Sequence, residues 1–258
     1  MTRVAWWVVV GLLVPVAAAA EGPGELPTDL IVERSIAEGG VTLRVRLVRP
    51  SAEDRRDHAT DLLPLVVVPA PPGAGVSGAK GWATFSTSVL VSVDARLRYP
   101  AFVAELSLVG VEDRALRGGA EPSGDERRVA ALAAAVDALV GEYAVDPHRV
   151  FLVGEGEGAD LAWRLLAGTP ERYAARVFIG GLLDPQLVGR VYGTPLWVFC
   201  DAADERAPIE RTRAVVSAIW AGGGTRARYT ETRDSGPVWN AAWREDRLLP
   251  WLFSQSRE

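Results

Sequence analysis

The sequence is poor in several residues and patterns that mark large classes of protein. It contains a single cysteine, Cys200, so the chain cannot form an internal disulfide bond, and an oxidising compartment would leave no mark on it. The net charge is −5 and like charges form no long runs, so the chain offers nucleic acid no basic surface. Because it has no basic surface, we expect no nucleic-acid partner. Repeats and low-complexity tracts are also absent from the sequence, which excludes repeat arrays.

What is present is an ordinary globular composition behind an apolar leader. Hydrophobic residues make up 48% and charged residues 24% of the 258 positions, which is enough for a sizeable core. The first 20 residues carry one arginine, an apolar run from Val4 to Val16, and Ala17 to Ala20, the layout of a secretory signal peptide. We predict cleavage near Ala20, a single domain over residues 21–258, a secreted or periplasmic location and no membrane span after cleavage. The alternative is an uncleaved anchor, because the apolar stretch is nearly as long as the roughly 20 residues that cross a bilayer; it falls just short of that length.

Strand and helix patterns alternate along the rest of the chain. Residues 29–49 alternate apolar and polar side chains around Gly39 and Gly40, which predicts an antiparallel hairpin at a sheet edge. The unbroken apolar run 62–68 is typical of a central strand that is covered on both faces. Further strands are expected at 101–109, 149–153, 175–181, 194–200 and 227–232, and helices at 125–143, after the glycine turn 154–158, at 208–223 and at 241–253. This order predicts an α/β fold with a doubly wound, mainly parallel sheet, whose ligands bind at the carboxyl ends of the strands.

The stretch RVFLVGEGEGADLAW, residues 149–163, reads as a buried strand, a tight glycine turn and a helix. Such a turn is used by dinucleotide-binding loops and by the nucleophile elbow of serine hydrolases. Gly154, Gly156 and Ala159 satisfy the dinucleotide pattern G-x-G-x-x-A. However, Glu155 and Glu157 would repel a pyrophosphate at the helix N-terminus, and no acidic residue ends the following strand to hold the ribose. The dinucleotide hypothesis is therefore disfavoured, and we expect no cofactor.

From about Asp29 onward the chain resembles the α/β-hydrolases. It is similar to their secreted phospholipase and carboxylesterase branch, which includes feruloyl-esterase-like proteins and is related to prolyl oligopeptidases. The resemblance depends on the segments 142–181, 194–213 and 222–255, and is weakest between Gly73 and Ser123. It implies a sheet of α/β-hydrolase type with the predicted hairpin at its edge.

The resemblance also implies where a catalytic triad would stand. In that family the elbow reads G-x-S-x-G; here Gly154 and Gly158 match the flanking glycines, and Gly156 occupies the nucleophile position. The family histidine would fall in the loop after the last strand, where this chain has Pro237 in SGPVW. Asp204 retains the type of the third member. A hydroxyl and an imidazole are therefore both missing from the implied positions.

Nothing nearby in the sequence replaces the missing groups. The only histidines are His58, in a charged loop before a strand, and His148, at the opposite end of the elbow strand. Ser235 lies near the lost histidine but has no base beside it and is typical of a turn. The oxyanion loop is also altered, because PAPPGAG places Pro72 before Gly73 and removes a backbone N–H donor.

Acidic and aromatic side chains around the implied crevice suggest binding. Carboxylates at a helix N-terminus stabilise the helix, and this alone can account for the two elbow glutamates. The alternative is that acidic residues converge on the crevice and favour a cation. The residues concerned are Glu155, Glu157, Asp160, Asp201 and Asp204. Their spacing matches no metal-binding motif, so no metal site is predicted. Trp239 could wall a pocket, and Trp82 could belong to a lid.

These observations predict an exported, non-catalytic protein of α/β-hydrolase type that binds a small molecule or an envelope protein. The alternative is an active secreted esterase or peptidase with a non-standard catalytic set.

Overall fold

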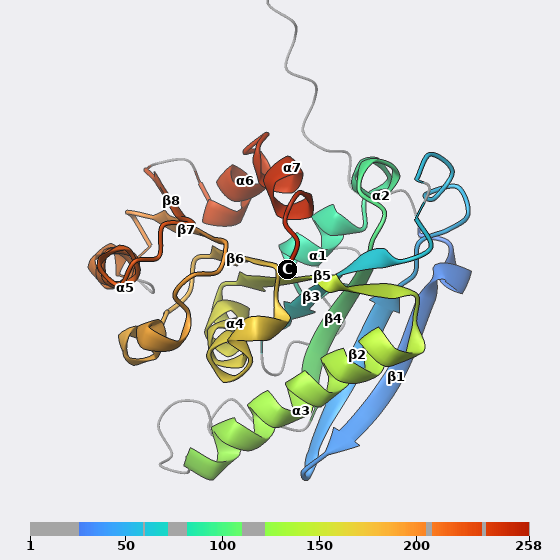
Figure 1. Cartoon of the computed structure of the whole chain (residues 1–258), viewed down its shortest axis with the longest axis horizontal. Helices are drawn as coiled ribbons and strands as arrows, with labels where there is room; N and C mark the ends of the chain where they lie inside the picture. The colour runs from blue at the N-terminus through green and yellow to red at the C-terminus, as the bar shows by residue number, and fades with distance from the viewer. Residues whose placement is uncertain are drawn as a thin grey trace, which may run out of the picture.

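The computed structural model describes residues 26–58, 60–71, 82–109, 122–204, 208–233 and 236–257. They form one eight-stranded sheet with helices on both faces (Figure 1). The strand order is β1-β2-β4-β3-β5-β6-β7-β8. The strands are β1 (Ile31–Glu38), β2 (Val41–Val48), β3 (Leu63–Pro69), β4 (Phe102–Val109), β5 (Val145–Glu155), β6 (Ala175–Ile179), β7 (Leu196–Asp201) and β8 (Ala227–Thr232).

The sheet has the predicted topology. β1 and β2 form an antiparallel hairpin at the edge, β2 pairs antiparallel with β4, and all later pairings are parallel. Every residue of β3 is buried, as expected for a central strand. In β2 the side chains of Leu43, Val45 and Leu47 are buried while those of Thr42, Arg44 and Arg46 between them are half-buried, which is the alternation of a strand with one covered face. The predicted fold class and edge hairpin are confirmed.

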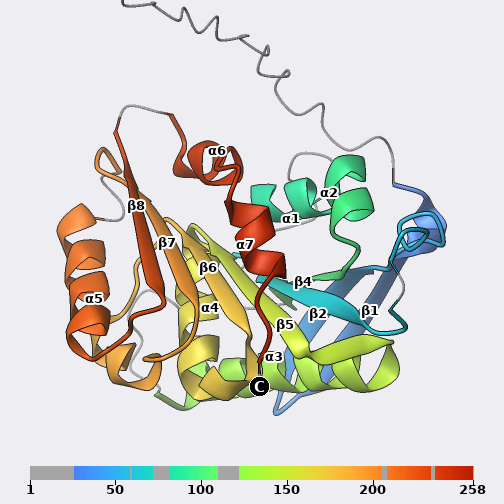
Figure 2. The same cartoon turned by 45° about the horizontal axis from the view of Figure 1, so that its top comes forward.

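Helices cover the sheet in two layers. α3 (Pro122–Glu142), α4 (Glu157–Gly168) and α5 (Ile209–Ala221) pack on one face. The other face carries the shorter helices α1 (Phe85–Leu90), α2 (Val93–Arg98), α6 (Val238–Trp243) and α7 (Leu248–Phe253), as Figure 2 shows. Short 3-10 helices occur at η1 (Thr28–Leu30), η4 (Pro170–Arg172) and η5 (Pro185–Arg190). Each layer encloses its own apolar cluster, so the sheet separates two hydrophobic cores.

Two parts of the helical pattern differ from expectation. The helix predicted over 241–253 is instead α6 and α7, separated by residues 244–247. Pro250 explains the break, because its ring would clash with the carbonyl of residue 246 in a continuous helix but is tolerated in the first turn of α7. The sequence patterns also missed α1 and α2, whose first turns are capped by the side chains of Thr84 and Ser92.

The order in which the chain adds parallel strands to the sheet reverses between β3 and β5: β4 is added on one side of β3, and β5 to β8 are added on the other side. In chain order the parallel strands run 2-1-3-4-5-6 across the sheet, the flavodoxin-like arrangement, whose ligands bind outside the carboxyl ends of the strands at the reversal. The elbow turn follows β5 at this point. No helix of the described residues is both long and apolar enough to span a bilayer. The predicted signal peptide, residues 1–20, lies outside the described residues.

Candidate functional site

The elbow is a sharp turn centred on Gly156. This residue is the N-cap of α4, with φ 55° and ψ −125°, a backbone conformation that residues with a side chain rarely adopt. Its N–H donates to the Ile179 carbonyl at 2.9 Å, and its own carbonyl accepts from the Ala159 N–H at 3.1 Å. A Cβ placed on Gly156 would have no heavy atom of the described residues within 4 Å. The turn therefore has the strained geometry and the open space of a nucleophile position, but no side chain.

The flanking glycines are required by close packing. A Cβ at Gly154 would lie 2.7 Å from the Cα of Ala159, and one at Gly158 would lie 2.4 Å from the Pro69 carbonyl oxygen. These contacts hold the start of α4 against the ends of β3 and β5. The G-x-G-x-G pattern thus has a structural reason at its outer positions, whereas space does not require glycine at Gly156.

The loop that carries Pro237 lies close to the elbow. A Cβ on Gly181 would lie 2.3 Å from the Gly156 carbonyl oxygen, and one on the adjacent Gly180 would lie 3.3 Å from Val238. Pro237 itself is exposed and is the N-cap of α6. The structure therefore brings the nucleophile and histidine positions implied by the resemblance to one end of the sheet. Neither position carries a group that can react.

Glu155 is turned away from the crevice and anchors α1. Its carboxylate accepts from the backbone N–H of Phe85 at 3.1 Å and of Ser86 at 2.7 Å, and from the Ser86 hydroxyl at 2.5 Å. Burial raises the pKa of Glu155, opposed by the hydrogen bonds from Ser86. Trp243 of α6 completes the arrangement by donating its indole N–H to the Ser86 oxygen at 3.1 Å.

A second carboxylate holds the same helix. Glu105 of β4 is 2% exposed and accepts from the N–H groups of Ala83 and Thr84 and from the Thr87 hydroxyl. Two acidic residues, one within β4 and one at the end of β5, thus satisfy the free N–H groups at the start of one short helix. Sequence reasoning missed this clamp, although Glu105 interrupting an otherwise apolar strand is a signal that could have found it.

The other acidic residues have separate partners. Asp160 pairs with Arg164 at 3.2 Å on the surface of α4, and Glu157 is exposed. Asp201 is 8% exposed and accepts from the Ala203 N–H at 2.7 Å and the Thr232 hydroxyl at 3.0 Å, which closes the turn after β7. The N–H of Asp204 donates to the Asp201 carbonyl in this turn. The structure therefore does not bring these carboxylates together, and no cluster of metal-ligating side chains occurs in the described ranges.

The histidines lie away from the elbow. His148 is exposed near the beginning of β5, seven residues before Glu155, which corresponds to about 23 Å along a strand. His58 lies beside α2, with Nε2 3.4 Å from the Leu97 carbonyl oxygen. Neither can act as the base of an elbow nucleophile. Ser235, Pro72 and Gly73 lie outside the described residues.

The tryptophans near the crevice mostly serve packing. Trp82 is 3% exposed and stacks under the Arg46 guanidinium at 4.1 Å, so it belongs to the core and not to a lid. Trp239 is half-buried and packs against the cluster beneath α6 and α7. Trp239 therefore borders the elbow end of the sheet without standing free in it.

The fold is shared with known hydrolases. The chain superposes on a thermostable esterase with a TM-score of 0.73 and 24% identity over 89% of this chain and 64% of that one. For an acylaminoacyl peptidase from Pyrococcus horikoshii the TM-score is 0.61 and the sequence identity 15%, with 83% of this chain and 39% of that one covered. For a dienelactone hydrolase-like promiscuous phosphotriesterase from metagenomic libraries the TM-score is 0.57 and the identity 18%, with 80% of this chain and 82% of that one covered.

The chain thus spans less than two thirds of the first two of these proteins. No protein-family model matches the sequence, and no curated protein matches it. The likeness in structure, together with the mixed sheet and the strained glycine elbow, identifies the fold of this chain as that of the α/β-hydrolases.

Proposed function

We propose that this chain is a non-catalytic protein of α/β-hydrolase fold that is exported from the cytoplasm and acts by binding. The observation that carries the proposal is Gly156, which has the backbone strain of a nucleophile elbow and open space for a side chain, but no hydroxyl. Covalent hydrolysis by this fold requires an attacking group at that position and a base beside it.

The loop around Pro237 supports the same conclusion. Proline can neither accept nor deliver a proton at the position of the family histidine, and the two histidines of the sequence lie elsewhere. Asp204 would have no imidazole to orient. The ligand is a small molecule or an envelope protein, and the apolar leader with its small-residue cleavage site supports export.

One contact favours a second candidate, an esterase or peptidase with a non-standard set. The Ser86 hydroxyl donates to the Glu155 carboxylate at 2.5 Å, which is the arrangement of a nucleophile and a base. Ser86 is, however, 0% exposed, and the same carboxylate is occupied by two backbone N–H groups. We favour the binding protein because a hydroxyl without access to solvent cannot reach a substrate.

Ester hydrolysis separates the two candidates. The purified chain is assayed with short p-nitrophenyl esters beside two variants, Ser86→Ala and the double variant Gly156→Ser with Pro237→His. We expect no turnover above the buffer rate from the unmodified chain or from Ser86→Ala. Turnover that the Ser86→Ala variant loses would establish the second candidate. Turnover only in the double variant would confirm the positions of the missing groups.

Ligand binding is tested directly by thermal shift. The chain is screened against divalent cations, polyamines and cell-wall fragments, and a ligand of the crevice should raise the melting temperature. An elbow ligand should lose its effect in Gly156→Trp, where the indole would fill the open space. A flat response to every compound, together with no partner captured from envelope extract, would count against a binding role.

A further inference from the structure

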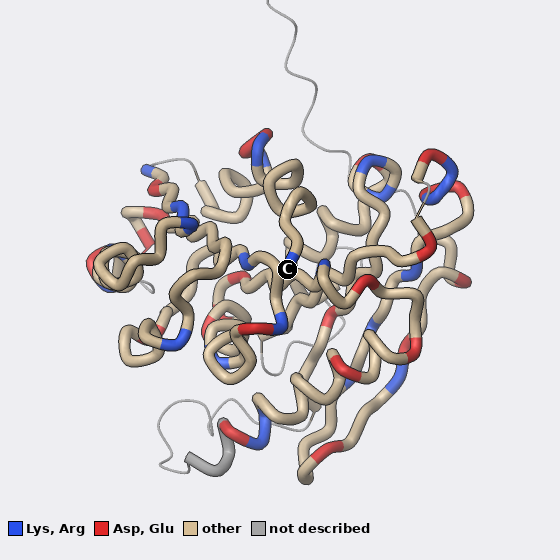
Figure 3. The backbone as a smooth tube through the Cα atoms, in the orientation of Figure 1, with Lys and Arg blue, Asp and Glu red and all other residues tan. Residues whose placement is uncertain are grey.

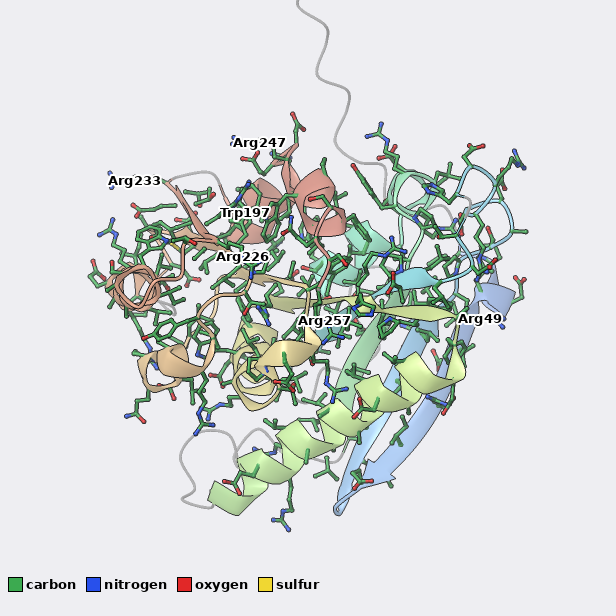
Figure 4. All side chains as sticks on the ribbon, in the orientation of Figure 1. Arg49, Trp197, Arg226, Arg233, Arg247 and Arg257 are labelled. Atoms are coloured by element: carbon green, nitrogen blue, oxygen red, sulfur yellow. The ribbon has the colours of Figure 1, made fainter. Side chains whose placement is uncertain are left out.

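Arginine side chains gather at the amino ends of β6, β7 and β8, far from the elbow. Arg176 is the second residue of β6 and is 1% exposed, Arg226 immediately precedes β8, and Arg257 lies near the end of the chain. Arg176 pairs in register with Leu196 of β7, and Leu196 with Ala227 of β8, so these strand starts lie within about 10 Å. Figure 2 shows the C-terminus beside this end of the sheet, and Figure 4 labels Arg226 and Arg257 near it.

Each of these guanidinium groups donates to backbone carbonyls rather than to a carboxylate. The acceptors are Pro170 for Arg176, Glu171 and Pro147 for Arg257, and Gly193 for Arg226. Arg176 and Arg257 thus bond to the carbonyls of consecutive residues in η4, which places their charged groups close together. Within the part of the chain that the structure describes, neither these two nor Arg226 forms an ion pair.

The same cluster concentrates buried donors that have no acceptor. In the described ranges, the buried side-chain nitrogen and oxygen atoms without a hydrogen-bond partner belong to Arg34, Arg55, Arg96, Arg172, Tyr173, Arg176 and Arg257. Among them are Nε and Nη1 of Arg176, Nε of Arg257 and Nε of Arg172. Buried polar groups in native proteins are almost always paired, and a guanidinium can only donate. The partner that these nitrogens require is therefore an acceptor.

The charge of the cluster points the same way. Burial lowers the pKa of Arg176 to about 9; Tyr173 and Glu171 oppose this effect, whereas Arg226 and Arg257 add to it by repulsion. The nearest ion pair in η4, between Arg172 and Asp137, already satisfies that carboxylate. A negatively charged partner would relieve the repulsion and accept from several guanidinium groups at once.

We propose that this arginine cluster binds a small tetrahedral oxyanion, either inorganic phosphate or sulfate or the same group on a monoester. Arg226 is exposed and lies at the outer side of the site, Arg257 is half-buried, and Arg176 is fully buried at its inner side. Arginine suits this chemistry because its planar fork matches the spacing of phosphate oxygens. The site lies at the amino ends of the strands, so it is independent of the elbow and of the function proposed for it.

Isothermal titration of the purified chain at pH 7 tests the proposal. The probes are inorganic phosphate, sulfate and phenyl phosphate, with chloride and acetate at matched ionic strength. The variants are Arg226→Gln and Arg257→Gln, which each remove one donor group, and the matched control is Arg98→Gln. Arg98 is an exposed arginine at the end of α2, which leads into β4, and β3 and β5 separate β4 from β6; its loss changes the net charge equally.

We expect saturable binding of phosphate and sulfate, weaker by about tenfold or more in Arg226→Gln and Arg257→Gln and unchanged in Arg98→Gln. Tighter binding of phenyl phosphate than of phosphate would identify a monoester as the ligand. Absence of heat with all three oxyanions would overturn the proposal. Equal weakening in Arg98→Gln, or equal response to chloride, would also overturn it, because the effect would then be general electrostatics.

Discussion

The hydroxyl of Ser86 lies 2.5 Å from the carboxylate of Glu155, although the two residues are 69 positions apart in the sequence. This contact joins α1 to the last residue of β5, one position before the elbow glycine. Because Trp243 bonds to the same hydroxyl, the contact also ties α6 to α1. A hydrogen-bonded network next to the elbow therefore links β5, α1 and α6.

Glu155→Ala should destabilise the fold by about 1–3 kcal/mol, because it leaves the buried N–H of Ser86 and the N–H of Phe85 without an acceptor. Chemical denaturation followed by tryptophan fluorescence measures the loss. The neighbouring Glu157→Ala is the matched control, since Glu157 is exposed, and should change the free energy of unfolding by less than about 0.5 kcal/mol. Equal losses in both variants would mean that Glu155 does not anchor α1.

The free energy of unfolding should depend on pH through Glu155. Burial raises the pKa of this carboxyl in the folded state above its ordinary value of 4.5, so the folded chain takes up the proton at higher pH than the unfolded chain. Its contribution to stability is then fully present below pH 4.5 and is lost as the pH rises through the raised pKa. Because glutamine resembles the protonated carboxyl, the free energies of unfolding of the unmodified chain and Glu155→Gln should lie closest at low pH, and the unmodified chain should lose stability relative to the variant as the pH rises. A constant difference between them would contradict the assignment.

Two glycines of the elbow, Gly156 and Gly158, should respond differently to alanine. Gly156→Ala should cost about 1–3 kcal/mol through backbone strain alone, because its Cβ meets open space. Gly158→Ala should cost more or prevent folding, since its Cβ would lie 2.4 Å from the Pro69 carbonyl. Gly141→Ala in α3 serves as the control and should stabilise the chain by about 0.5–1 kcal/mol. Urea denaturation ranks the variants; a Gly156→Ala variant less stable than Gly158→Ala would be inconsistent with the described turn.

The thiol of Cys200 should resist alkylation in the folded chain. Burial raises the pKa of this thiol, so the reactive thiolate is scarce at neutral pH, and the side chain is 2% exposed. Iodoacetamide should label it readily only after denaturation, as measured by intact mass. Rapid labelling of the native chain would show that the end of β7 opens easily.

Much of the fold could be predicted from the sequence because its signals are local. The alternation in β2, the apolar run of β3 and the glycine turn before α4 each depend on residues adjacent in the chain. The missed features depend on distant contacts or on one residue in a helical pattern. The division between α6 and α7 follows from Pro250, whose effect depends on where the second helix begins.

The sequence indicated where along the sheet the elbow and the loop of Pro237 lie, but not which partners the acidic side chains have. The elbow follows β5 and the loop of Pro237 follows β8, so both lie at the end of the sheet where the parallel strands finish. The direction of Glu155 could not be inferred, since it depends on α1, whose sequence lies in the region of weakest resemblance. The partners of Asp160 and Asp201 are likewise set by their own turns, and these carboxylates do not converge on one point.

The most direct measurement is labelling of the purified chain with a fluorophosphonate probe at high concentration, followed by intact-mass analysis. Because Gly156 has no hydroxyl and Ser86 is fully buried, we expect no adduct on the unmodified chain, while a serine hydrolase run in parallel is labelled completely. An adduct on any serine of this chain, formed at a rate that heat denaturation abolishes, would contradict the claim that it has lost covalent catalysis.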